Sequence, residues 1–116
     1  MGAKLSSPKT KQVTNSSLKK LAWAVAMHET HNCEDKTNFT AGNNCHGIKK
    51  YRNGRLMPAR YASIEESHKD FVDIWSRLYG GRTVPTKADA VKWSGNDKAD
   101  EWHANVLYFL LNPITK

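Results

Sequence analysis

The segment SIEESHKDFVDIWSRLYGG, residues 63–81, carries start and stop signals for an amphipathic helix at its two ends. Ser63 offers an N-cap hydroxyl, and Glu66 stands at the third helical position, the spacing of a capping box. The pair Gly80-Gly81 ends the helix. One face is lined by Ile64, His68, Phe71, Trp75 and Leu78, and is widened by Val72, Ile74 and Tyr79. Because an apolar face this wide must pack against other elements, we expect a helical domain.

Two shorter helices are predicted downstream. TKADAVKW, residues 86–93, has Thr86 as its cap. A last helix runs from about Asp97 to Asn112 and is stopped by Pro113. Its inward positions are Trp102, Val106, Phe109 and Leu110.

A first helix is expected to begin at Asn15–Ser17, which offer N-cap oxygens, and to run to about His31. Its apolar stripe is formed by Leu18, Leu21, Ala22 and Val25. Glu29 falls on the same stripe, one turn after Val25. His31 projects nearly opposite toward solvent, and His28 lies to the side. Glu29 is therefore expected to face the core or the wall of a cleft.

Residues 32–61 lose the helical period. The stretch NFTAGNNCHG is rich in turn-forming Asn and Gly. GIKKYRNGRLMPARYA then predicts a β-hairpin, because Asn53-Gly54 is a strong two-residue turn signal, with Pro58 at an edge or bulge. The expected fold is mainly α (α+β), with one small hairpin. Residues 1–14 are predicted to be a flexible basic arm or linker, and residues 15–116 the folded domain.

The charge of the chain narrows its possible partners. At 116 residues and a formal net charge of +7, we expect one domain whose partner is an acidic polymer or surface. The longest apolar run, Leu21 to Met27, is far shorter than the roughly 20 residues that span a bilayer, so no stable membrane insertion is expected. KKLAWAVA mimics a signal peptide only weakly, and we interpret it as part of the first helix, so no export signal is evident.

The two cysteines allow two interpretations. Cys33 and Cys45 flank one short segment, and in an oxidising compartment they would form a disulfide. Alternatively, His28, His31, Cys33, Cys45 or His46 would supply a structural zinc site. The two helical histidines stand three apart rather than four, and no C-x-x-C is present. We therefore predict no metal and no other cofactor.

Glu29 is the strongest candidate for chemistry. Desolvation on the apolar stripe and the negative end of the helix dipole both raise the pKa of a carboxyl group. A carboxylic acid that stays neutral near pH 6–7 is suited to protonating a glycosidic oxygen.

The order AVAMHETHNC, NNCHGIK and RYASIEESHKDFVDIWSRLYGG resembles the lysozyme-like superfamily. It is most similar to small bacterial and phage lytic transglycosylases and N-acetylglucosaminidase-type peptidoglycan hydrolases. The resemblance covers roughly residues 18–112. It implies a lysozyme-like catalytic domain that cleaves the β-1,4 bond between N-acetylmuramic acid and N-acetylglucosamine in peptidoglycan strands.

The resemblance also implies roles for individual residues. Glu29 matches the general acid, and Tyr61 matches a tyrosine that lines the site near it. The substrate-binding positions are Asn44, His46, Gly47, Ile48 and Tyr108. His46 departs from the apolar or aromatic residue that is common there, which leaves its role open. A disulfide between Cys33 and Cys45 would pin the loop directly after Glu29.

The second carboxylate of a hydrolase is left open by the sequence. Asp35, Glu65 and Glu66 are the candidates. If none serves, the 6-hydroxyl of the substrate would form a 1,6-anhydro sugar.

Two rival functions remain. One is a small basic nucleic-acid- or zinc-binding module; the other is an inactive relative that only binds glycan. We expect no nucleic-acid partner, because the cations gather in the arm and hairpin and the tryptophans lie on inward stripes. The expected protein is a monomer that acts in the cell envelope, periplasm or secreted fraction, or is delivered by a phage. Cations that would steer it to its polymer are Lys49, Lys50, Arg52, Arg55 and Arg60.

Overall fold

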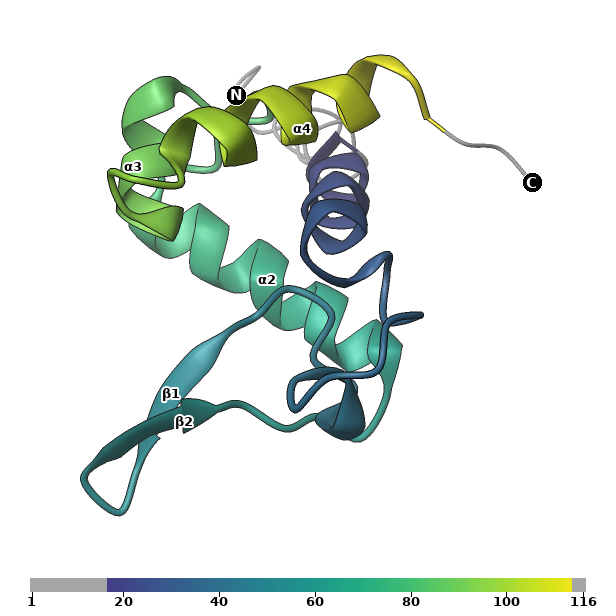
Figure 1. Ribbon diagram of the computed structural model, residues 1–116, viewed down its shortest axis with the longest axis vertical. Helices are drawn as coiled ribbons and strands as arrows, with labels where there is room; N and C mark the ends of the chain where they lie inside the picture. Colours follow the sequence, from purple (N-terminus) through teal and green to yellow (C-terminus); the bar gives the residue numbers. More distant parts are fainter. Residues whose placement is uncertain (1–16, 114–116) are drawn as a thin grey trace, which may run out of the picture.

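The computed structural model describes residues 17–113 and confirms a mainly α fold with one small hairpin (Figure 1). An N-terminal helix, described over residues 17–30, is followed by a disulfide-closed loop and a two-stranded sheet. The helices α2 (Ile64–Leu78), α3 (Lys87–Ser94) and α4 (Ala99–Leu111) complete the chain. The predicted arm, residues 1–14, and the helix start at Asn15 lie outside the described residues.

The core forms where the N-terminal helix, α2, α3 and α4 meet. Leu21 and Val25 are fully buried there, as the apolar stripe of the first helix predicts. Aromatic rings fill the rest: Trp75 of α2 stacks on Tyr79 at 4.2 Å and lies 6.4 Å from Trp102 of α4. α3 and α4 pack against each other (Figure 1). Within residues 17–113 no helix is long and apolar enough to cross a membrane.

The buried face of α2 differs from the predicted one at both ends. Its fully buried positions are Ser67, Phe71 and Trp75, whereas Ile64 is 43% exposed and Leu78 is 53% exposed. The prediction that Ile64 and Leu78 face the core is wrong. Both lie in the terminal turns of α2, and Leu78 lines an open cleft.

The helix caps follow the sequence signals closely. The Ser63 hydroxyl accepts a hydrogen bond from the Glu66 N–H at 3.2 Å, and Thr86 and Asp89 form a complete capping box at α3. Among the described residues no bond returns from the Glu66 carboxylate to Ser63, so the capping box predicted at α2 is half formed. Gly80 ends α2 with a φ of 73°, a conformation that favours glycine.

The hairpin consists of β1 (Lys49–Arg52) and β2 (Arg55–Pro58), which pair antiparallel. Asn53 and Gly54 both have positive φ, as a type I′ turn requires, which confirms the predicted turn. Pro58 ends β2 opposite Lys49. The hairpin extends away from the helices (Figure 1).

The loop between the N-terminal helix and β1 is closed by the Cys33–Cys45 disulfide, which confirms the predicted pairing. Thr30 ties both cysteines to the helix end: its hydroxyl accepts from the Cys33 N–H at 2.8 Å and donates to the Cys45 carbonyl at 2.9 Å. The short 3₁₀ helix η1 (Thr40–Gly42) lies inside the loop. A bond across a loop of this length stabilises the fold by about 3 kcal/mol on the chain-entropy model.

Candidate active site around Glu29

Glu29 lies in the last turn of the N-terminal helix and faces α4. The indole Nε1 of Trp102 donates a hydrogen bond to Glu29 Oε2 at 3.0 Å. Trp102 itself is almost fully buried. The carboxylate is therefore held at the edge of the core, by a partner 73 residues later in the chain.

Burial raises the pKa of the Glu29 carboxyl group above its ordinary value. Several smaller effects lower this pKa: the charge of His28, the hydrogen bonds of Trp102 and Trp93, and the charge of Lys98. Desolvation is larger than these effects together, so the net pKa is raised. The direction agrees with that expected from the apolar stripe. Glu29 thus holds its proton to a higher pH than an exposed glutamate and can act as a proton donor.

Glu29 opens into a cleft of about 530 Å³ between the start of the hairpin, α2 and the end of α3. The cleft is lined by Glu29, Gly47, Ile48, Lys49, Lys50, Ile74, Leu78, Trp93, Ser94 and Lys98. Gly47 has a φ of 72°, and a Cβ at this position would lie 3.6 Å from Glu29 Oε1. Of the predicted site residues, the structure therefore brings Glu29, Gly47 and Ile48 together.

Lysines dominate the charge of this cleft. Lys49, Lys50 and Lys98 line it, and Glu29 is its one lining carboxyl group among the described residues. The Lys50 ammonium lies 2.7 Å from the Asp70 carboxylate. Lys49 and Lys98 take part in none of the ion pairs found within residues 17–113. The cleft is thus suited to an anionic ligand.

The candidates for a second carboxylate lie elsewhere. Asp35 is on the surface, where its carboxylate lies 3.1 Å from His31 Nδ1. Glu66 is exposed in the first turn of α2. Glu65 lines a separate groove. None of the three borders the Glu29 cleft.

Asn44 and His46 are fully buried behind the cleft rather than lining it. The Asn44 amide donates to the carbonyls of Ile48 at 2.7 Å and Ala59 at 2.9 Å, and its oxygen accepts from the Ile48 N–H. Asn44 therefore fixes the loop that carries Gly47 and Ile48, and its contacts are structural.

His46 packs between the N-terminal helix and α2. Its Nε2 donates to the Ala22 carbonyl at 2.8 Å, and its ring stacks on Phe71 at 4.8 Å. Its Nδ1 is buried without a hydrogen-bond partner among the described residues. Burial is the main cause that lowers the pKa of His46 to about 3, so the ring is neutral at pH 7.

The two predicted tyrosines lie outside the cleft. The Tyr61 hydroxyl donates to Asp70 at 2.5 Å, in a hollow beside the hairpin that shares Lys50 with the cleft. Tyr108 is 58% exposed on α4 and lies against Phe109. Neither tyrosine is thus among the residues that line the Glu29 cleft.

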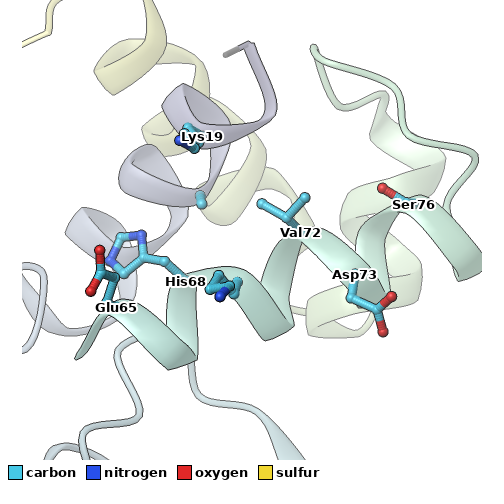
Figure 2. Close-up of a pocket in the computed structure, with 8 residues that line it drawn as sticks. Lys19, Glu65, His68, Val72, Asp73 and Ser76 are labelled. Carbon is cyan, nitrogen blue, oxygen red and sulfur yellow. The ribbon is translucent and has the colours of Figure 1, made fainter. Parts of the chain in front are cut away.

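A larger groove, of about 800 Å³, lies between the N-terminal helix and α2 (Figure 2). Glu65 and His68 lie at one end and Asp73 and Ser76 at the other, with Val72 between them (Figure 2). Its charges alternate in sign, and the Glu29 carboxylate does not reach it. The smaller cleft is the candidate site, because it is lined by Glu29, the carboxyl group whose pKa burial raises.

The structure leaves no free thiol at Cys33 or Cys45 for the alternative zinc site. Cys33 and Cys45 are bonded to each other, and no cluster of three metal-ligating side chains occurs within residues 17–113. His31 contacts Asp35 on the surface, and His28 Nδ1 accepts from the Asn105 amide of α4 at 3.3 Å.

Sequence reasoning missed Trp102, Trp93 and Lys98 as parts of the site. Trp102 was predicted to be inward-facing, but no local signal pairs its indole with Glu29. Trp93 and Lys98 flank the turn between α3 and α4, which brings them to the cleft. The packing of α3 and α4 brings Trp93 and Lys98 to the cleft, and no pattern within a few residues of either one indicates this position.

Replacing Trp102 with Phe is expected to raise the pKa of Glu29 further, because the ionised carboxylate loses its hydrogen-bond donor. The free energy of unfolding should fall by about 1–3 kcal/mol from the lost bond and the small cavity. NMR titration of the Glu29 side-chain carboxyl carbon measures the pKa. Trp23→Phe is the matched control, since Trp23 packs on Phe109. An unchanged titration midpoint in Trp102→Phe would show that the indole does not control the acid.

No family model, no curated protein and no solved structure matches this chain.

Proposed function

We propose that the chain is a glycosidase that cleaves peptidoglycan strands at the β-1,4 bond after N-acetylmuramic acid, with Glu29 as the general acid. One observation carries the proposal: a single desolvated carboxyl group with a raised pKa lies in an open cleft beside Gly47 and Ile48. The fold class and the resemblance of the sequence motifs to lysozyme-like enzymes support the same assignment.

The chemistry begins with proton transfer. Glu29 donates its proton to the glycosidic oxygen, the bond to the anomeric carbon breaks, and an oxocarbenium-like transition state develops. Two-carboxylate glycosidases place their second group about 5–9.5 Å from the first. Since no second carboxyl group of the described residues lines this cleft, we propose that the muramic acid 6-hydroxyl attacks the anomeric carbon. Its proton passes to the Glu29 carboxylate, and a 1,6-anhydro sugar forms.

The lysines of the cleft support a peptidoglycan substrate. Stem peptides give these strands carboxylates near the muramic acid, and Lys49 and Lys98 offer charges of opposite sign. The proposed substrate lies in the cell envelope, where a disulfide such as Cys33–Cys45 is stable.

The proposal is tested by digesting purified peptidoglycan with the wild-type chain and identifying soluble fragments by mass spectrometry. We expect fragments that end in 1,6-anhydro-N-acetylmuramic acid. Fragments with reducing muramic acid ends would support the glycosidase function but refute the intramolecular attack, because water would then be the nucleophile. Release of no fragments from peptidoglycan of several wall chemistries would refute the proposed function.

A further inference from the structure

The hairpin presents an apolar pair directly to solvent. Tyr51 of β1 and Leu56 of β2 are cross-strand partners, so their side chains lie on the same face of the sheet. Tyr51 is 76% exposed and Leu56 is 54% exposed. The ribbon therefore carries an apolar spot that the rest of residues 17–113 leaves largely exposed.

Cations stand next to this pair in both strands. Because successive side chains of a strand alternate between its faces, Lys50, Arg52 and Arg55 lie on the face of the ribbon opposite to Tyr51 and Leu56. Residues 49–60 contain no Asp or Glu, and their cations are Lys49, Lys50, Arg52, Arg55 and Arg60. Within the described part of the chain, Lys50 alone of these five has an ion-pair partner, Asp70.

Two of the cations are placed unfavourably for the isolated hairpin. Arg52 stands directly opposite Arg55 in the register, next to the turn. Like charges that face each other across a ladder destabilise the pairing. An anionic surface would remove this repulsion, since both guanidinium groups would bind its negative groups.

The hairpin also has the position that a docking element needs. It extends beyond the helices, so that a flat surface can approach its tip without touching the helical part (Figure 1). The Glu29 cleft lies at its base, where Lys49 and Lys50 contribute to the lining.

We propose that the β1–β2 hairpin docks the protein on the surface of an anionic phospholipid bilayer. When the tip of the ribbon enters a bilayer interface, both of its faces meet lipid: phosphates bind Arg52 and Arg55 on one face, while the Tyr51 ring and the Leu56 side chain on the other enter the boundary between headgroups and acyl chains. A soluble polyphosphate or nucleic acid would bind the arginines but offer Leu56 no apolar environment. This docking is peripheral, and it does not depend on the proposed glycosidase activity.

Vesicle flotation tests the proposal with the full chain. We expect binding to vesicles of phosphatidylcholine with about one third phosphatidylglycerol, and little binding to pure phosphatidylcholine. Raising NaCl from 0.05 to 0.5 M should weaken the binding several-fold, because exposed charges are screened. Equal binding to both vesicle types, or none to either, would overturn the proposal.

Two double variants separate the charges from the apolar pair. Arg52→Gln with Arg55→Gln should weaken binding roughly 25-fold, at about fivefold per cation near an anionic surface. Tyr51→Ser with Leu56→Ser should weaken it at least about tenfold, because apolar burial in the interface is lost. Val84→Ser with Leu111→Ser is the matched control, since both residues are exposed elsewhere, and should bind like wild type.

The outcome for the serine pair decides between a bilayer and a polyanion. If Tyr51→Ser with Leu56→Ser binds vesicles as well as wild type, attraction to charge alone explains the binding, and bilayer docking is refuted. Competition by soluble polyphosphate at equal phosphate concentration should displace little wild-type protein. Circular dichroism confirms that each variant is folded.

Discussion

Glu29→Gln is expected to reduce fragment release from peptidoglycan at least about a hundredfold, the lower end of what a positioned general acid contributes. The amide has nearly the same shape as the carboxyl group, and its oxygen can still accept the Trp102 hydrogen bond. It has no acidic proton to donate to the glycosidic oxygen. The measurement is the initial rate of soluble fragment release at equal protein concentration.

The control for this loss is Glu65→Gln, which makes the same change in the groove between the N-terminal helix and α2. It should retain wild-type release. Thermal unfolding of both variants shows whether either is destabilised. Equal release by wild type and Glu29→Gln would refute the role of Glu29, even if the protein is a glycosidase.

The activity of the wild type should fall as pH rises through the raised pKa of Glu29, because the proton donor is then lost. The Trp102→Phe variant should show this fall at a higher pH. Activity that instead rises over the same range would identify Glu29 as a base rather than an acid.

The second large effect concerns stability in acid. His46 has a folded-state pKa of about 3 against an ordinary value of 6.5, because it is buried and lies 4.6 Å from the His68 ring. Below pH 6.5 the unfolded chain binds a proton at this position that the folded chain excludes. Stability is therefore fully present above pH 6.5 and is lost as pH falls toward 3. The full pKa shift contributes about 5 kcal/mol to the free energy of unfolding above pH 6.5, and about 3 kcal/mol of this contribution is lost by pH 4.5.

Urea unfolding at pH 7 and pH 4.5 measures this loss. His46→Gln can keep a donor to the Ala22 carbonyl but does not titrate, so its stability should depend less on pH, although it is less stable at pH 7. The exposed His31→Gln is the control and should keep the wild-type pH dependence.

Other groups with shifted pKa values also change the free energy of unfolding between pH 7 and pH 4.5. The pKa of His68 is lowered by burial and adds to the acid loss. The raised pKa of Glu29 acts in the opposite direction. The lowered pKa of Asp70 matters only near and below its ordinary value of 3.8. If wild type and His46→Gln lose equal stability by pH 4.5, the acid sensitivity does not come from His46.

The elements of the fold were predictable wherever a signal acts within a few residues. The Ser63 cap, the Gly80 stop, the Asn53-Gly54 turn and the Thr86 cap are all local backbone chemistry, and each is present. The position of Glu29 on the buried stripe followed from helical geometry in the same way. The disulfide stayed one of two alternatives in the sequence, because cysteine spacing alone does not distinguish sulfur pairing from metal binding.

The sequence alone determined the helices, the hairpin and the place of Glu29 on the core-facing stripe, because caps, turns and helical periodicity depend on neighbours in the chain. Only the tertiary structure decided what surrounds Glu29. The packing of α2, α3 and α4 brings the Trp102 indole to the Glu29 carboxylate. It also places Lys98 and Leu78 in the lining of the same cleft. The same packing buried Asn44 and His46 and separated Tyr61 from the cleft, since burial depends on which helices meet and no local pattern specifies that.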